Sequence, residues 1–467
     1  MSSIESIAHP SMPKSIRTQA KAPSLKALAV GAALLLLGGV ALAQAVGEVD
    51  FARGVGFAQT DGQLPRTLGK GLALKEGDKL STADGSLAVI KMQDGTRMTV
   101  RPNSEIVIQQ YKFKEADPDN SMVMQLLRGG FRAITGLISK NSPSAARVVT
   151  KTATIGIRGT DFDARICTTD CKAESEKVSE KHRQNAVLAS AKVVNSQGDI
   201  SALDGAGARR KVVDGGSVYP GETLETSVGA KAVLAFRDDS RMTLGGATRF
   251  RVDSFVYDDQ NPKEGRFLVS LLKGSMRALT GLISKANNRN VGFTTATATI
   301  GIRGTGLDLD CNDDGTGEAC SIYTWLGSIE VTPLGQTDIR VLEAGQGLFV
   351  SPSAIRPLVA PTLQNLQRPD GVSVDTKQLF SASAVDDGKE GLFVFVRDGH
   401  IEVTTASETL HLGRGEAGFA GLDGLTARPT LMPLFLEFDR TPMPNSRNPL
   451  AATVLETSGA HALNICK

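Results

Sequence analysis

One nine-residue string occurs twice in this chain and constrains its fold more than any other feature. Thr-Ala-Thr-Ile-Gly-Ile-Arg-Gly-Thr spans residues 152–160 and recurs unchanged at residues 297–305. A second shared string, Thr-Gly-Leu-Ile-Ser-Lys, precedes it at residues 135–140 and again at 280–285. Because a long internal repeat is the signature of a duplicated structural unit, the sequence predicts two related units.

The duplication extends well beyond these strings. Adding 144 to a residue number maps Gly54 onto Gly198 and Arg97 onto Arg241, and one inserted residue raises the offset to 145, so that Arg158 maps onto Arg303. The matches fall at turns and strand ends as well as within strands. We therefore expect a first repeat at residues 46–185 and a second at residues 186–351.

Short alternating runs broken by turn residues predict strands rather than helices. Residues 86–92 and 96–100 flank Gln93-Asp94-Gly95, and Asp-Gly between two β-rich runs is a strong hairpin signal. Glycine accounts for 49 of the 467 residues and aromatic residues for only 5%, which indicates many turns and few large cores. The predicted class is all-β, with two tandem β-sandwich or β-roll-like repeats.

A partial third β unit is expected near the C-terminus. Residues 323–347 and 394–418 share one order: strand, tight turn, strand, loop, strand, glycine. Between them, the Pro-rich residues 351–369 look like an exposed linker. We expect a linker at 352–386, the partial third unit at 387–440 and a tail at 441–467.

The N-terminus has the form of a secretory signal peptide at residues 1–45. Residues 27–43 are almost entirely apolar, follow a basic leader and end in Ala41-Leu42-Ala43, the small residues of a cleavage site. The alternative is an uncleaved membrane anchor, for which this run is at the lower length limit. Either reading places the rest of the chain in an oxidising compartment.

The five cysteines favour two local disulfides. Cys167 and Cys311 are equivalent in the two repeats, and each is followed by a second cysteine, Cys171 or Cys320. The duplication favours the pairs Cys167–Cys171 and Cys311–Cys320, with a zinc site as the rival, and leaves Cys466 unpaired.

The motifs resemble the FecR family of Gram-negative envelope proteins. The segments that carry the resemblance are residues 77–82, 94–104 and 154–162, and the second copy departs from them where Gly306-Leu307 replaces Asp161-Phe162. The resemblance implies an exported, all-β, non-catalytic interaction domain, present twice. The best-known relatives look like iron-uptake regulators with a cytoplasmic anti-sigma segment, but here only residues 1–26 precede the apolar run, so sigma-factor control is not expected.

The sequence is compatible with three functions. The first is an exported, non-catalytic periplasmic or surface protein that binds or scaffolds an envelope protein or glycan. The second is a transmembrane FecR-type regulator with an uncleaved N-terminal helix, which alone would involve the membrane. A cell-wall glycan-processing enzyme is the third, against which the missing nucleophile–base motif argues. We expect no cofactor, and a net charge of only +2 argues against a nucleic-acid partner.

The arginine of the repeated string is expected to be structural. Glycines bracket it in both copies, and we assign a structural motif to Arg158, Gly159 and Thr160 and to Arg303, Gly304 and Thr305. Its planar fork suits backbone carbonyls or a carboxylate, with Asp161 and Asp163 the expected partners of Arg158. Contact with a ligand is the rival interpretation.

Two weaker patterns suggest metal sites. Asp310, Asn312 and Asp314 have the spacing of a calcium loop, but Ser321 stands where the bidentate glutamate is needed, so an acidic hairpin tip is preferred. We expect His400 and His411 to face each other across strands, and a surface pair is preferred over a metal site.

Overall fold

The computed structural model describes residues 44–141, 145–179, 181–313 and 318–437, and the chain from Ala45 onward forms a compact unit by itself. Most of the predicted signal peptide, the tail at 441–467 and Cys466 lie outside these ranges. Within them, no helix is both long and apolar enough to cross a membrane.

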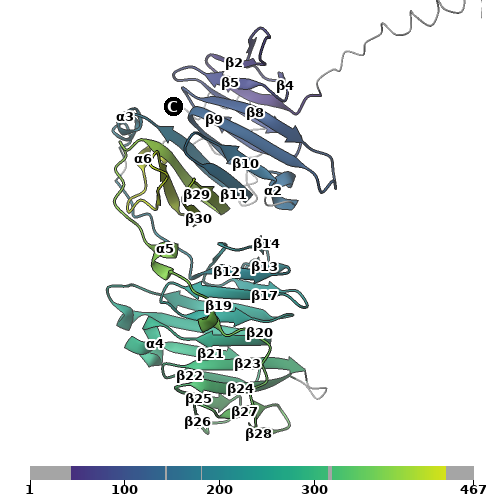
Figure 1. The fold of residues 1–467 in the computed structure, drawn as a ribbon, viewed down its shortest axis with the longest axis vertical. Helices are drawn as coiled ribbons and strands as arrows, with labels where there is room; N and C mark the ends of the chain where they lie inside the picture. The colour runs from purple at the N-terminus through teal and green to yellow at the C-terminus, as the bar shows by residue number, and fades with distance from the viewer. Residues whose placement is uncertain (1–43, 142–144, 180, 314–317, 438–467) are drawn as a thin grey trace, which may run out of the picture. The chain divides into compact units, whose positions relative to one another are not determined.

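The described chain is all-β, as predicted, and its strands form two extended sheet systems (Figure 1). We call them the first and the second β unit. The first has 15 strands and the second has 17. Each is a roll of two sheet layers that share one long strand, β9 (Ser121–Ile134) or β20 (Arg266–Leu279).

The remaining strands of the first unit are β1 (Gly47–Arg53), β2 (Gly56–Gln59), β3 (Arg66–Thr67), β4 (Ala73–Leu74), β5 (Lys79–Thr82), β6 (Leu87–Met92), β7 (Arg97–Val100), β8 (Glu105–Lys112), β10 (Ala146–Val149), β11 (Thr154–Cys167), β29 (Gly391–Thr404), β30 (Thr409–Gly413), β31 (Ala417–Gly421) and β32 (Thr426–Ala427). The short helices α2 (Leu137–Asn141), α3 (Cys171–Ser175) and α6 (Leu434–Glu437) accompany them.

The remaining strands of the second unit are β12 (Ala191–Gln197), β13 (Ile200–Leu203), β14 (Arg209–Val212), β15 (Ser217–Val218), β16 (Thr223–Thr226), β17 (Lys231–Phe236), β18 (Arg241–Leu244), β19 (Arg249–Val256), β21 (Val291–Thr295), β22 (Ala298–Ile302), β23 (Gly306–Asp313), β24 (Glu318–Leu326), β25 (Ser328–Pro333), β26 (Arg340–Glu343), β27 (Gly347–Val350) and β28 (Ile355–Leu358). Its helices are η1 (Pro262–Glu264), α4 (Leu282–Ala286), η2 (Asn288–Asn290), η3 (Pro369–Gly371) and α5 (Thr376–Phe380).

The two units repeat the same strand pairings. The path β1–β6–β7–β9 matches β12–β17–β18–β20, and in each unit the long strand makes one parallel pairing, with β10 or with β21. The predicted hairpin at Asp94-Gly95 joins β6 to β7. The duplication seen in the sequence is therefore a duplication of topology.

The segment expected to be a partial third unit belongs to the first sheet system. β29 pairs antiparallel with β11 along nearly its whole length, from Thr154↔Thr404 to Cys167↔Gly391, and Figure 1 shows β29 and β30 beside β11. In the second unit, β24 and β25 pair in the same way with β23 and β22. β29 thus takes the place in the first unit that β24 and β25 take in the second. The whole second unit lies between β11 and β29 in the sequence.

Two glycines mark this shared arrangement. Gly399 in β29 and Gly327 between β24 and β25 both have positive φ, +90° and +70°. A Cβ at either position would collide with the backbone of Gly159 or Gly304, in the repeated string. Close backbone approach therefore requires glycine at these two equivalent turns.

Each unit has its own hydrophobic core, between its sheet layers. The core of the first unit combines residues from its N-terminal strands, such as Val49 and Phe162, with residues of the C-terminal strands, such as Leu392 and Ile401. The core of the second unit is built from residues 191–350. The C-terminal strands are thus part of the first core.

The expected linker at 352–386 is partly built into the second unit. β28 pairs with β27, and the following Leu363 and Leu366 are buried. Because these two apolar side chains are buried, this Pro-rich stretch is not simply an exposed connection.

Candidate functional site

The two repeated strings contact each other in both units. The Thr160 amide donates to the Thr135 hydroxyl at 2.7 Å, and the Thr135 amide donates back to the Thr160 carbonyl. Thr305 and Thr280 make the same two bonds. Gly159 and Gly304 have positive φ, +64° and +71°. These shared residues therefore close a corner of the fold.

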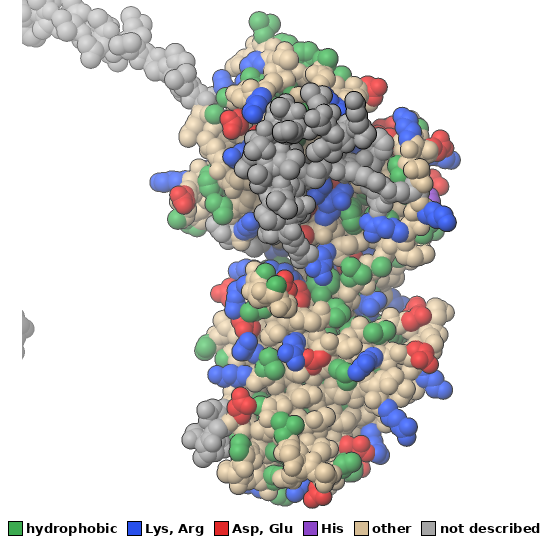
Figure 2. Space-filling model, turned by 180° about the vertical axis from the view of Figure 1, so that it is seen from behind, with side chains coloured by type: hydrophobic (Ala, Val, Ile, Leu, Met, Phe, Trp, Pro, Cys, Tyr) green, Lys and Arg blue, Asp and Glu red, His purple; other side chains and the backbone are tan. Residues whose placement is uncertain are grey.

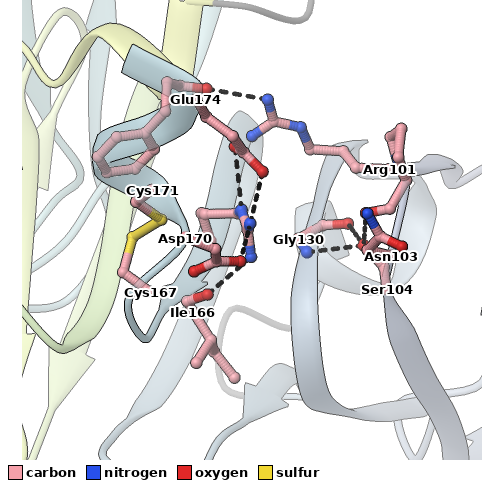
Figure 3. A network of polar contacts seen from close by, with 12 residues as sticks. Arg101, Asn103, Ser104, Gly130, Ile166, Cys167, Asp170, Cys171 and Glu174 are labelled. Carbon is pink, nitrogen blue, oxygen red and sulfur yellow. Dashed lines mark hydrogen bonds and ion pairs between the residues drawn. A yellow bond between two sulfur atoms is a disulfide. The ribbon is translucent and has the colours of Figure 1, made fainter. Parts of the chain in front are cut away.

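A second corner is preserved although its sequence differs between the copies. The Ser104 hydroxyl accepts from the Gly130 amide at 2.9 Å and donates to the Gly130 carbonyl at 3.0 Å, as Figure 3 shows. In the second unit, the Thr248 hydroxyl makes the same pair of bonds with Ser275. Both copies keep the hydroxyl that ties β9 to the β7–β8 turn or β20 to the β18–β19 turn.

The arginines of the repeated string pair with glutamates of the neighbouring strand. Arg158 donates to Glu402 on β29 at 2.6 Å, and Arg303 pairs with Glu330 on β25. The expected partners of Arg158, Asp161 and Asp163, are bound by other arginines. The prediction of a carboxylate partner holds, but the assignment of Asp161 and Asp163 was wrong, because those side chains lie beyond a bulge in the β11–β29 pairing.

A polar row crosses the outer face of each sheet and is the strongest candidate site. In the first unit, Val89, Thr99, Arg132 and Asp163 are consecutive cross-strand partners, and in the second unit Val233, Thr243, Arg277 and Asp308 take the same places. We call each set a Thr-Arg-Asp row. The chain neighbours of every row residue belong to the hydrophobic core, so the row lies on the opposite face.

The first row is held by two arginine–aspartate pairs. Arg132 binds Asp161 through two parallel bonds of 3.0 Å, and both side chains are nearly buried. Arg397 of β29 binds Asp163 at 2.7 Å. Planar two-bond contacts of this kind fix geometry as well as charge.

The second row reaches a similar arrangement with different residues. Gly306 stands where the first unit has Asp161, and Trp325 stands where it has Arg397. Without that aspartate, Arg277 binds Asp308 directly at 2.9 Å, and the Trp325 indole donates to the same carboxylate oxygen at 2.9 Å. A Cβ at Gly306 would collide with the indole ring, so the two exchanges depend on each other.

Each row contains a carboxylate oxygen that has no hydrogen-bond partner within the part of the chain that the structure describes. These are Oδ1 of Asp163 and Oδ2 of Asp308, and both are buried. Burial raises the pKa of Asp163 to about 6, against the opposing effect of Arg397, and burial likewise raises the pKa of Asp308. Asp163 therefore changes charge near neutral pH, which is typical of functional groups and of buried ion pairs alike.

A short segment covers each row, and in both cases it follows the last strand of its unit. We call residues 431–437 the first strap and residues 359–371 the second strap. In the first, carbonyls of Phe435 and Leu436 accept from Arg101 and Arg397. In the second, carbonyls of Leu363 and Leu366 accept two bonds from Arg277, at 3.0 and 2.7 Å.

A cavity adjoins each row. One of about 500 Å³ is lined in part by Arg132, Thr160, Asp161 and Arg397 in the first unit. The other, of about 470 Å³, lies between the second row and its strap. Both volumes are within the range of small-molecule sites, about 300–1000 Å³.

The two disulfides are the local pairs that the sequence favours. Cys167 is bonded to Cys171, and Cys311 to Cys320. Figure 3 shows the first of these beside Asp170 and Glu174. Both carboxylates bind the buried guanidinium of Arg165 at 2.6 Å, and these ion pairs outweigh burial and raise the pKa of Arg165. The disulfide loop therefore holds the acidic partners of a buried cation.

A further buried charge cluster joins β12 to the β30–β31 turn. Lys192 and Arg428 both contact Glu416, at 3.4 and 2.9 Å, and also donate to the His411 carbonyl. Burial lowers the pKa of Lys192 to about 8, while the two cations outweigh burial and lower the pKa of Glu416. Because two cations share one carboxylate, this cluster connects β12 to the β30–β31 turn. The sequence did not predict it, because its residues are far apart in the chain.

The metal candidates do not form a cluster. His400 and His411 lie with their rings 5.5 Å apart, but His400 is buried rather than on the surface, and burial lowers the pKa of both. Asp310 and Asn312 lie in β23 and bond to each other, and Asp314 lies outside the described residues. Across residues 44–437 as described, no three His, Cys, Asp or Glu side chains are placed to hold a metal ion.

Sequence reasoning missed the row although a signal for it was present. Arg132 and Asp163 map onto Arg277 and Asp308 with the same offset of 145 as the repeated arginine. Glu402 and Glu330 also hold equivalent places in the two matching C-terminal stretches. What the sequence did not contain was the register that places these residues side by side.

Comparison with known proteins identifies the repeated regions. The model of the family described as FecR protein matches residues 78–179 and 222–329. The first match ends before β29, whereas the second includes β24. No curated protein matches the chain.

Among solved structures, the chain is similar to two crystal structures of a candidate anti-sigma factor from Parabacteroides distasonis ATCC 8503. In each case the identity is 15%, the TM-score is 0.24, and the match covers 30% of this chain and 59% of the other. The chain thus spans less than two thirds of the length of that protein, and a likeness this weak carries no weight for fold or function.

Proposed function

Because the chain carries two FecR-family regions, we propose that it is an exported, non-catalytic envelope protein whose two β units bind or scaffold a periplasmic or surface partner. The observation that carries this proposal is the internal use of the charged residues that both copies share. Arg158 and Arg303 bind glutamates, and Arg132 and Arg277 bind aspartates, so each shared arginine holds strands together. What the two units have in common is a scaffold.

The disulfides and the surface support the location and the kind of partner. One disulfide in each unit favours an oxidising compartment. On the face seen in Figure 2, acidic and basic side chains are interspersed, with hydrophobic side chains among them. A face without a single-sign field suits a protein or glycan partner better than nucleic acid.

Affinity capture tests the binding role. The protein, cross-linked in the envelope and purified, should retain a specific partner that an unrelated exported protein, treated in the same way, does not. If the protein captures no partner above that background, the binding role is wrong.

The second candidate is a transmembrane regulator of the FecR type, which the family match favours as well. N-terminal sequencing of the protein from fractionated cells separates the two. A mature chain that begins at Gln44 or Val46 excludes the regulator, whereas an intact N-terminus in the membrane fraction supports it. Release of sugar from purified cell wall would instead favour a glycan-processing enzyme.

A further inference from the structure

We propose that the second β unit binds an acidic sugar in the cavity between its Thr-Arg-Asp row and the second strap. The inference rests on the proposed binding role and names a ligand class for it. The cavity measures about 470 Å³ and is lined by Asn195, Gln197, Lys231, Val233, Thr243, Arg277, Gln364, Asn365, Leu366, Gln367 and Arg368. Five of these eleven residues carry a side-chain amide.

The floor of the cavity offers an unpaired hydroxyl. Thr243 is 1% exposed, and its Oγ1 has no hydrogen-bond partner among the described residues. Cross-strand pairing puts Asn195 beside Val233 and Val233 beside Thr243, with Gln197 opposite Lys231. Since residues two apart point to the same face of a strand, all five side chains belong to one surface.

The ceiling is held in place from both ends. Arg277 donates to the carbonyls of Leu363 and Leu366, and both leucines are buried. At the other end, the guanidinium of Arg368 lies 3.8 Å from the centre of the Trp325 ring. The amide side chains of Gln364, Asn365 and Gln367 are therefore carried by a fixed segment rather than by a free loop.

The chemistry of this lining suits a hydroxylated ring with one negative charge. Side-chain amides both donate and accept hydrogen bonds, as sugar hydroxyls do. An apolar ligand would cover the exposed amides and the buried Thr243 hydroxyl without offering them hydrogen bonds. Burying polar groups without partners is unfavourable. Lys231 makes no ion pair among the described residues, so it is available for a carboxylate, while Arg277 and Arg368 have acidic partners in Asp308 and Asp370.

The first unit shows which of these residues the fold does not need. Phe51, Arg53 and Leu87 occupy the places of Asn195, Gln197 and Lys231, whereas Val, Thr and Arg are the same in both rows. The shared arginines serve the scaffold through their ion pairs with Asp161 and Asp308. The two side-chain amides and the lysine at these places belong to the second unit alone, as expected of a site that only one copy uses.

Isothermal titration of the full-length protein tests the proposal with D-glucuronate as the probe, and with D-glucose and acetate as probes that lack the charge or the hydroxyls. We expect glucuronate to bind about ten-fold more tightly than glucose, as one charge-assisted contact would give, and acetate not to bind. Lys231→Leu, which installs the residue of the first unit, should remove that preference. Thr243→Val should weaken both sugars by about five-fold. Lys273→Leu, an exposed lysine of β20 away from the cavity, is the matched control.

Binding of acetate as tight as that of glucuronate, unchanged affinity in both Lys231→Leu and Thr243→Val, or no sugar binding at all would overturn the proposal. Thermal unfolding of each variant confirms that it is folded before titration. If envelope capture succeeds and glucuronate fails to bind, the sugar site is wrong while the binding role stands.

Discussion

Removal of the C-terminal strands tests whether the first β unit is completed from the far end of the chain. We consider a chain that stops after Asp386. It lacks β29–β32 and α6 but keeps every strand of the second unit and the second strap. We expect the first unit to unfold and the second to remain folded.

The magnitude follows from the side chains that the missing strands bury. Seven aliphatic side chains of β29 and β30 lie in the first core, none more than 7% exposed: Leu392, Val394, Val396, Ile401, Val403, Leu410 and Leu412. Burying one such side chain contributes about 1.5–3 kcal/mol, so their loss costs roughly 10–20 kcal/mol. A typical domain is stable by only about 5–15 kcal/mol, and the first unit should therefore not survive.

Calorimetry combined with limited proteolysis measures the outcome. The full chain should protect both units, whereas the truncated chain should lose part of its unfolding enthalpy and be cleaved within residues 44–179 but not within 190–358. A chain that stops after Glu437, and so keeps all described residues, is the control. Equal protection of residues 44–179 in both proteins would refute the topology on which the reasoning depends.

Four further predictions follow from the ion pairs and disulfides. Arg158→Ala should destabilise the protein by about 1–3 kcal/mol in chemical denaturation and Arg303→Ala by about 0.2–1 kcal/mol, because Arg158 is 23% exposed and Arg303 is 51% exposed; a larger effect at Arg303 would contradict this. The folded pKa of Asp163, about 6, exceeds the unfolded value of about 3.9, so the folded state binds the proton more tightly than the unfolded state. The free energy of unfolding should therefore decrease as the pH rises from about 4 to 6, by up to about 3 kcal/mol relative to Asp163→Asn. Stability that rises over this range relative to the Asn variant would show that Asp163 is ionised throughout. Gly306→Asp and Trp325→Arg should each destabilise the second unit, whereas the double variant should recover about 0.5–3 kcal/mol as it recreates the first row; simple additivity in the double-mutant cycle would disprove the coupling. Peptide mapping without reduction should find Cys167 joined to Cys171 and Cys311 joined to Cys320, and because such short loops constrain the unfolded chain little, loss of either should cost toward the low end of about 0–5 kcal/mol.

The sequence by itself determined the features that depend on local pattern and on comparison of the two copies. Alternating runs around Asp94-Gly95 predicted the β6–β7 hairpin, and a constant offset predicted two units of one topology. The duplication favoured a local bridge between Cys167 and Cys171. In each case the interacting residues are near in the chain or have an equivalent in the other copy, so local preference is enough to reveal them.

Only the tertiary structure decided which strands complete each unit and which acidic residue each arginine meets. Residues 323–347 and 394–418 look alike in sequence, yet the former closes the second unit and the latter closes the first. Arg158 therefore meets Glu402, a residue 244 positions away, rather than the nearby Asp161. Strand pairing depends on backbone hydrogen bonds, which are the same for every sequence. The partner of a strand on the far side of an inserted unit is therefore selected by burial of the whole core. Neither strand carries a local sequence pattern that identifies its partner.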